Sequence, residues 1–192
     1  MTTRSTSCRS SSAYLFHSRQ QTALLQGEIL LETKAHTAWG AAVIAQMYVP
    51  TERSQVWQQL TNYSRWEQFF PDITQSRALG STRFHESGLI SEKRLYQAAS
   101  KSFLFITVQV EAYLKVVETF EQRVQFYFES GSFIDFGADL QLQDYGEGTL
   151  VRYSVQASPL IPVPSPFIQQ AIHMDLPCNM RHMRQLICAA NY

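Results

Sequence analysis

The segment 165–190 constrains the fold more than any other part of the chain, because its pattern is that of one long amphipathic helix. Ser165 followed by Pro166 is a favourable helix start, since a serine N-cap accepts an orphan amide and proline at the first helical position has none to lose. Pro177 crowds the preceding turn, so we expect a kink near Leu176. Apolar residues recur every three or four positions, namely Ile168, Ile172, Leu176, Met180, Met183, Ile187 and Ala190. A helix that is apolar along one side requires a broad apolar surface to cover that side.

Residues 103–157 have the pattern of such a surface. Apolar and polar residues alternate, as in strands that bury one face and leave the other in water. The predicted inward positions are Leu104, Ile106, Val108, Val110, Ala112, Leu114, Val116, Val124, Phe126, Phe128, Ile134, Phe136, Ala138, Leu140, Leu142, Val151, Tyr153, Val155 and Ala157. Short turns at Ser130-Gly131 and at 146–148 separate the strands, which predicts an antiparallel meander.

The segment 29–99 is predicted to consist of one long strand, two short helices and then further strands. The first strand covers 29–49, with Gly40 as a bulge or bend, and Pro50 ends it. One helix carries Val56, Trp57 and Leu60 on one face, and a second runs from Ser64 to Phe70. Strands then follow at 73–79, before a turn at Gly80-Ser81, and at 82–99, where Gly88 divides the segment.

These elements predict an α+β helix-grip fold. A curved antiparallel sheet of about six to seven strands wraps around the long C-terminal helix, with two short helices after the first strand. The length of 192 residues fits one such domain, predicted at 28–192.

Residues 1–27 are predicted to be a flexible N-terminal tail, because they are rich in serine and contain no acidic residue. The alternative is an organelle transit peptide, which has a similar composition. The three cysteines have no metal-like spacing, which indicates unreactive thiols in a reducing compartment, and we expect a cytoplasmic protein.

Charge excludes some partners. Sixteen basic and sixteen acidic side chains cancel, which removes the long-range attraction to nucleic acid or to an anionic membrane. No run of 18 apolar residues exists, so we expect no transmembrane segment, although transient membrane contact stays open. The oligomeric state is not predicted.

Three stretches resemble a known family. They are Val56-Trp57 to Pro71-Asp72, with Leu60-Thr61-Asn62-Tyr63, Trp66 and Phe69 between them; Gly131-Ser132-Phe133 with Phe136-Gly137; and Thr149 to Tyr153. Over residues 40–190 the chain resembles the START-like, or SRPBCC, helix-grip superfamily, and within it the polyketide cyclase/dehydrase and coenzyme-Q-binding (COQ10-like) branch. The resemblance implies a deep pocket between sheet and terminal helix that holds lipids, sterols, quinones or polyketides.

A curved sheet and a helix laid across it leave a gap, which apolar side chains would make attractive to an apolar ligand. Methionines suit a wall that adapts to its contents. The same residues can instead fill a solid core. The predicted ligand-binding residues are Trp57, Val108, Val110, Phe126, Phe128, Phe136, Ala138, Val151, Tyr153, Ile172, Leu176, Met180 and Met183.

The candidates for catalysis are few. His85 and Glu86 are adjacent on a strand and point to opposite faces, and His173 and His182 lie out of phase on the helix, so neither pair forms a site. Asp135 and Asp139 share the face opposite Phe136 and Ala138, and are expected in solvent. Only Tyr153 places a hydroxyl inward, where it either anchors a ligand carbonyl or bonds to backbone.

Three functions follow. The first is binding or carriage of a hydrophobic small molecule. The second is a polyketide cyclase or dehydrase that uses the same pocket, with Tyr153 as proton donor. The third is a partner-binding assembly factor with a vestigial pocket. No metal site and no cofactor are predicted.

Overall fold

The computed structural model describes residues 19–34, 36–37, 40–85, 88–103, 106–160, 163 and 165–190. Within these residues eight strands form one antiparallel sheet in the order β1-β2-β8-β7-β6-β5-β4-β3. The strands are β1 Leu30–Lys34, β2 Ala41–Val49, β3 Ile73–Phe84, β4 Ile90–Phe103, β5 Ile106–Thr119, β6 Arg123–Gly131, β7 Phe133–Tyr145 and β8 Gly148–Pro159. Each strand from β3 to β7 pairs with the next strand along the chain, which confirms the predicted meander.

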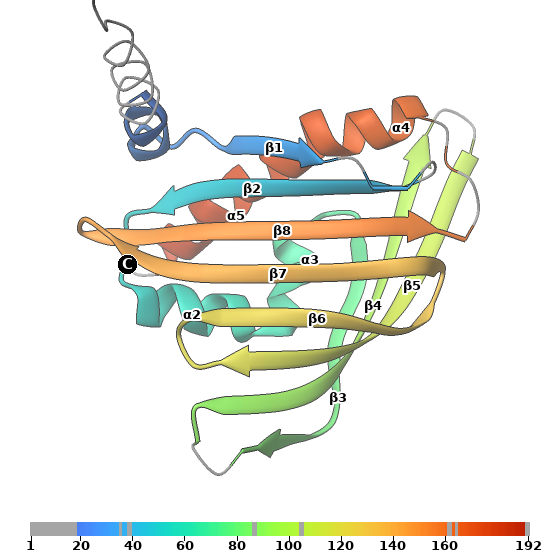
Figure 1. Cartoon of the computed structure of the whole chain (residues 1–192), viewed down its shortest axis with the longest axis horizontal. Coiled ribbons are helices and arrows are strands. Elements are labelled where there is room, and N and C mark those ends of the chain that lie inside the picture. The colour runs from blue at the N-terminus through green and yellow to red at the C-terminus, as the bar shows by residue number, and fades with distance from the viewer. Residues whose placement is uncertain are drawn as a thin grey trace, which may run out of the picture.

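The helices lie together behind the sheet as Figure 1 shows it. After β2 come α2 (Arg53–Thr61), the 3-10 turn η1 (Tyr63–Arg65) and α3 (Trp66–Phe69), in agreement with the two short helices predicted. The C-terminal helix consists of α4 (Ser165–Gln170), η2 (Ala171–Asp175) and α5 (Leu176–Ala189). The long strands β4 and β5 bend across the direction of β7 and β8, so the sheet curves around the helices (Figure 1). The helix-grip fold predicted from the sequence is therefore confirmed, with eight strands among the described residues.

The C-terminal helix runs without a break, and the kink expected near Leu176 takes the form of a π-helical turn, η2. The Leu176 amide donates to the carbonyl of Ala171, five residues earlier, in place of the usual four. Pro177, which has no amide to donate, stands in the first turn of α5. Beyond it Met180, Met183 and Ile187 are buried in the main core.

The segment 29–49 is two strands, not one. β1 and β2 pair antiparallel, with Leu31 opposite Ala45, so the chain reverses between Lys34 and Ala41. At Gly40 a Cβ would collide with the side chain of Ser158, which explains why this position carries glycine. The inward parity predicted for β2 is correct, since Ala45, Met47 and Val49 have no exposed surface.

Two further positions differ from the sequence prediction because of bulges. Gly80-Ser81 is a register shift inside β3 and not a turn, and the chain reverses after Phe84, near Gly88. A second shift between Phe133 and Asp135 turns Ile134 outward, where it is 67% exposed. Phe133 faces inward in its place. A bulge inserts one residue and reverses the parity that alternation predicts.

Part of the predicted N-terminal tail is ordered. Residues 19–25 form a helix, and Leu24 is buried. The helix ends in a Schellman motif, in which Gly27 donates to Leu24 and Glu28 to Ala23, with Gly27 at a positive φ. Residues 1–18, including Cys8, lie outside the described residues.

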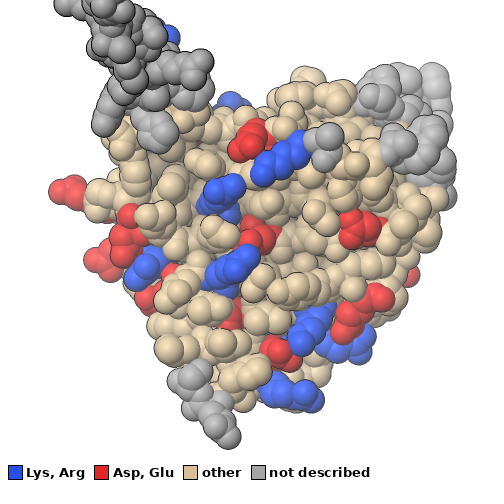
Figure 2. Space-filling view, viewed as in Figure 1, with Lys and Arg blue, Asp and Glu red and all other residues tan. Residues whose placement is uncertain are grey.

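The outer face of the sheet carries basic and acidic side chains close together, as Figure 2 shows. Arg123 and Asp139 form a two-bond ion pair there, at 2.8 and 2.7 Å. Asp135 accepts hydrogen bonds from His36 and Gln156 on the neighbouring elements. The two aspartates thus lie on the outer face, as predicted, and away from the helices.

Candidate functional site: a two-chamber apolar cavity

The larger of two adjoining chambers lies between the sheet and the first half of the C-terminal helix, and has a volume of about 460 Å³. β2, β4, β5 and β8 form its walls on one side, and α4, η2 and the start of α5 close the other. The lining residues are Ala41, Val43, Phe70, Asp72, Ala99, Val108, Val110, Tyr153, Val155, Ala157, Pro159, Val163, Ile168, Gln170, Ala171, Ile172, Asp175, Leu176 and Asn179.

The chamber stays open because several side chains on its sheet wall are short. Ala41 and Ala157 are opposite one another in the β2–β8 pair, and Ala99 projects from β4. A methyl group covers little of the distance from a curved sheet to a helix, so no side chain from these positions fills the space. The strong curvature of β4 and β5 adds to the separation (Figure 1).

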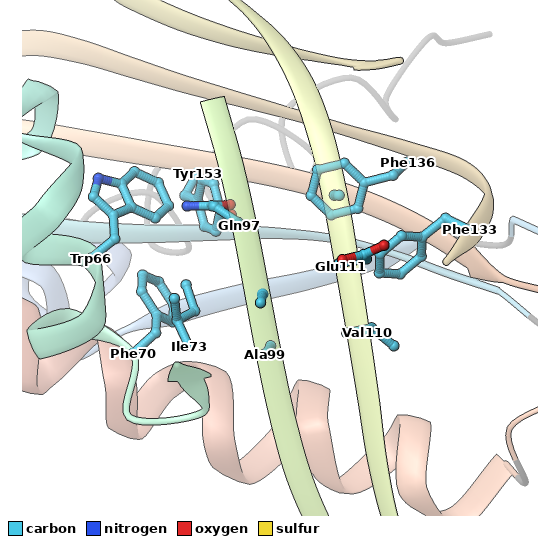
Figure 3. Close-up of a pocket in the computed structure, with 12 residues that line it drawn as sticks. Trp66, Phe70, Ile73, Gln97, Ala99, Val110, Glu111, Phe133, Phe136 and Tyr153 are labelled. Atoms are coloured by element: carbon cyan, nitrogen blue, oxygen red, sulfur yellow. The ribbon is translucent and has the colours of Figure 1, made fainter. Parts of the chain in front are cut away.

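The smaller chamber has a volume of about 170 Å³ and is lined largely by aromatic rings. Trp66 and Phe70 stack with ring centroids 5.6 Å apart, and Phe133 and Phe136 pack at 5.2 Å on the other side. Figure 3 shows these two pairs on either side of the space that β4 and β5 cross. The remaining lining residues are Ile73, Gln97, Ala98, Ala99, Val110, Glu111, Ala112 and Tyr153.

The two chambers adjoin, because Phe70, Ala99, Val110 and Tyr153 line both. Tyr153 packs against Trp66 and Phe70, each with ring centroids 6.3 Å from its own. Its hydroxyl makes no hydrogen bond to the residues that the structure describes. Burial raises the pKa of Tyr153, because the apolar surroundings disfavour the phenolate. The hydroxyl therefore remains a proton-bearing donor at neutral pH.

The structure divides the residues predicted to bind a ligand into two groups. Val108, Val110, Phe136, Tyr153, Ile172 and Leu176 line one or both chambers. Trp57, Phe126, Ala138, Val151, Met180 and Met183 belong to the closely packed core, with Phe128 against it. Met174 points outward and is 66% exposed.

Several cavity residues were not predicted. Trp66 and Phe70 were assigned to a short helix without a role, although their spacing of four residues places both rings on one face. Phe133 was missed because of the bulge that follows it. The alanines were missed because small residues carry no chemical signal, although Ala41 and Ala157 share the inward parity of their strands.

The other candidates for catalysis lie away from the chambers. His173 and His182 are exposed on the helix, and His85 pairs with Glu92 at 3.4 Å. Arg184 donates to the carbonyl of Tyr48 at 2.7 Å and so fastens α5 to β2. Glu86 lies outside the described residues. No group of acidic, histidine or cysteine side chains within the described part of the chain has the arrangement of a metal site.

A buried polar network lies under η1, outside both chambers. Glu118 on β5 accepts hydrogen bonds from Tyr63 at 2.5 Å and from Ser91 at 2.9 Å, and its carboxylate is 2.9 Å from the ammonium of Lys93. Burial and the nearby negative charge of Glu118 raise the pKa of Tyr63. These bonds connect η1 to the sheet, and the carboxylate of Glu118 has hydrogen-bonding partners at both oxygens.

A curved antiparallel sheet that grips a long terminal helix, with an apolar cavity between them, defines a helix-grip protein of the START and Bet v 1 type. Within that class, the chain belongs to the family of polyketide cyclases/dehydrases and lipid transport proteins, whose sequence profile matches residues 49–184. No curated protein shows significant similarity to the chain.

Solved structures share the fold. TTHA0849 from Thermus thermophilus aligns over 79% of this chain and 99% of its own, with 15% identity and a TM-score of 0.63. A STAR-related lipid transfer protein from Xanthomonas axonopodis aligns over 82% and 98%, with 13% identity and a TM-score of 0.57. A START superfamily protein from Mycobacterium smegmatis aligns over 85% and 97%, with 12% identity and a TM-score of 0.55. At these identities the likeness shows the fold.

No helix in the described part of the chain is long and apolar enough to cross a membrane.

Proposed function

We propose that the protein binds and carries a hydrophobic small molecule in the two-chamber cavity. The observation that carries this proposal is an apolar cavity of about 460 Å³ between the sheet and the C-terminal helix. Its walls are mainly valine, alanine, isoleucine and leucine side chains. Such side chains interact more favourably with an apolar ligand than with water.

The magnitudes favour a ligand that also makes a polar contact. A ligand that buries about 15 methylenes gains roughly 12 kcal/mol at about 0.8 kcal/mol each. Association costs about 4 to 15 kcal/mol, so apolar contact alone gives modest affinity. The hydroxyl of Tyr153, which has no hydrogen-bond partner among the described residues, supplies one donor beside the cavity.

The family membership supports the same function, since its description includes lipid transport. Lipids, quinones and polyketide-like molecules are the ligand classes that we propose. Quinone binding of the coenzyme-Q type rests on the resemblance of the residues around Trp57 and Trp66 to that branch.

Transient contact with a membrane would load such a ligand. Val108 lines the larger chamber and is 42% exposed, and Leu160, 57% exposed, follows the lining residue Pro159. Apolar side chains in these positions suit a brief contact with a lipid surface.

Native mass spectrometry of the purified full chain tests the proposal. We expect one additional mass per chain, corresponding to an apolar molecule that can be extracted and identified. Ala157→Trp fills the larger chamber and should abolish that mass, whereas Ala78→Trp on the exposed side of β3 should retain it. A wild-type chain that never carries a ligand, even after incubation with lipid extract, would count against the proposal and favour the assembly-factor hypothesis.

The second candidate, a polyketide cyclase or dehydrase, is favoured by one observation, the position of Tyr153 in the lining of both chambers. Such an enzyme would fold a reactive chain by confinement and use the hydroxyl as proton donor. Tyr153→Phe would then lose turnover and keep most of its substrate affinity. Equal loss of both would argue against this candidate.

A further inference from the structure

From the different linings of the two chambers, we infer the class of ligand that the cavity takes. We propose that the ligand is a flat six-membered ring joined to an aliphatic chain, with an oxygen on or beside the ring. The ring lies in the smaller chamber, the chain in the larger one, and the oxygen accepts a hydrogen bond from Tyr153. This inference rests on the proposed function.

The smaller chamber has the size and the walls for one ring. Its volume is about 170 Å³, and an engineered apolar cavity of about 150 Å³ is known to bind benzene. The Trp66–Phe70 pair and the Phe133–Phe136 pair border the same space (Figure 3). Aromatic walls favour a flat ring, since rings pack face to face with an offset or edge to face.

The larger chamber has walls of another kind. Among the described residues, the aromatic side chains that line it are Phe70 and Tyr153, and both also line the smaller chamber. Beyond that boundary the apolar lining consists of aliphatic residues, such as Val43, Val155, Ile168 and Ile172. Branched aliphatic side chains offer a flexible chain many weak contacts and no flat surface for a ring.

Tyr153 stands where the two chambers meet, and its ring touches both Trp66 and Phe70. Because its hydroxyl has no partner among the described residues, a bound ligand can satisfy it. An oxygen placed between ring and chain would lie at this boundary. A hydroxyl that faces an apolar cavity can offer its hydrogen bond to a ligand oxygen, so a ligand that accepts this bond binds more tightly than one that does not.

A set of four probes tests the inference by isothermal titration calorimetry with the full chain. Octanophenone has a ring, a carbonyl and a chain; octylbenzene lacks the carbonyl, 2-decanone lacks the ring, and acetophenone lacks the chain. We expect octanophenone to bind tightest. Loss of the carbonyl should weaken binding about fivefold, the effect of one neutral hydrogen bond. Loss of the ring or the chain should weaken it more than about tenfold.

Three variants locate the contacts. Tyr153→Phe should remove the difference between octanophenone and octylbenzene, while Tyr127→Phe on the outer face should preserve it. Ala112→Leu narrows the smaller chamber and should weaken octanophenone but not 2-decanone. Ala157→Leu narrows the larger chamber and should weaken both. Thermal unfolding confirms that each variant is folded, and the wild-type series is decisive even where a variant is not.

The outcomes separate the two proposals. If none of the probes binds, the cavity is not a site for hydrophobic ligands, and both proposals fail. If 2-decanone binds as tightly as octanophenone, the carrier function stands and the ring-and-chain inference is overturned. Equal effects of Ala112→Leu and Ala157→Leu on all probes would likewise show one undivided cavity.

Discussion

Two tyrosines, Tyr63 and Tyr153, should make the protein lose stability above about pH 10. Burial raises the pKa of both Tyr63 and Tyr153 above the usual value near 10, and Glu118 contributes to the shift at Tyr63. In the unfolded chain both phenols release a proton near pH 10, whereas in the folded chain they retain it. The unfolded state therefore binds fewer protons at alkaline pH, and the free energy of unfolding falls as pH rises. Below pH 10 both states are protonated, and the effect is absent.

The size of the loss follows from the linkage relation. At pH 11 an unfolded tyrosine is about ten-elevenths ionised, which favours the unfolded state by about 1.4 kcal/mol for each tyrosine retained in the protonated form. Tyr63 and Tyr153 together then cost about 2.8 kcal/mol relative to pH 8. For a domain of this size that lowers the melting temperature by about 6 to 11 °C.

Urea unfolding at pH 8, 10 and 11 measures this loss. For each variant, the free energy of unfolding at pH 11 is compared with that of the same variant at pH 8. In Tyr153→Phe and in Tyr63→Phe, this difference should be smaller than in the wild type by about 1.4 kcal/mol. Tyr127→Phe, which changes a 48% exposed ring on the outer face, is the control and should recover nothing.

The comparison within each variant removes the unrelated cost of deleting a hydroxyl. If Tyr153→Phe recovers nothing while Tyr63→Phe does, the Tyr153 phenolate forms without penalty in the folded chain. That result would refute the reasoning that the chamber around Tyr153 excludes water.

Two further substitutions test a buried ion pair and a tight turn. Lys93→Met should lower the free energy of unfolding by about 3 to 5 kcal/mol, because it leaves the carboxylate of Glu118 buried without its cation. If chemical denaturation shows a loss below about 1 kcal/mol, the carboxylate of Glu118 is hydrated in the folded chain. Gly131→Ala should cost about 1 to 3 kcal/mol, since Gly131 has a φ of +138° and a Cβ there would collide with the carbonyl of Glu111; an unchanged melting temperature would mean that the β6–β7 connection relaxes freely.

The sequence predicted the fold because alternation and helical periodicity persist over long segments. The inward positions of β2, β5 and β8 follow directly from parity, and the stripe of the C-terminal helix predicts the burial of Met180, Met183 and Ile187. These patterns depend on which side of an element meets water, and that property is local to the element.

The errors in the predicted strands arose where the chain departs from a regular strand over a few residues. The chain reverses between Lys34 and Ala41, although the sequence there has the pattern of one continuous strand. The bulge between Phe133 and Asp135 turns Phe133 inward and Ile134 outward. The helix before Gly27 was missed, although Gly27 after Leu24 and Leu25 is a typical helix end.

The candidate site was harder to predict than the fold. Periodicity assigns a residue to the inner face, and both core and cavity wall belong to that face. Met180 fills the core and Leu176, one turn earlier, lines the chamber. The difference depends on the separation between helix and sheet at each point, which no local pattern encodes.

The π turn at Ala171–Asp175 holds one more residue per hydrogen-bonded turn than an α-helix. Because this turn already accommodates one extra residue, the loss of a residue here would convert it into an ordinary α-helical turn and leave α4 and α5 on nearly the same faces. The same loss within α5 would rotate the helix that precedes it by about 100°, since 3.6 residues complete an α-helical turn. The helical wall of the larger chamber therefore has one point at which chain length can vary without turning the lining side chains away from the ligand.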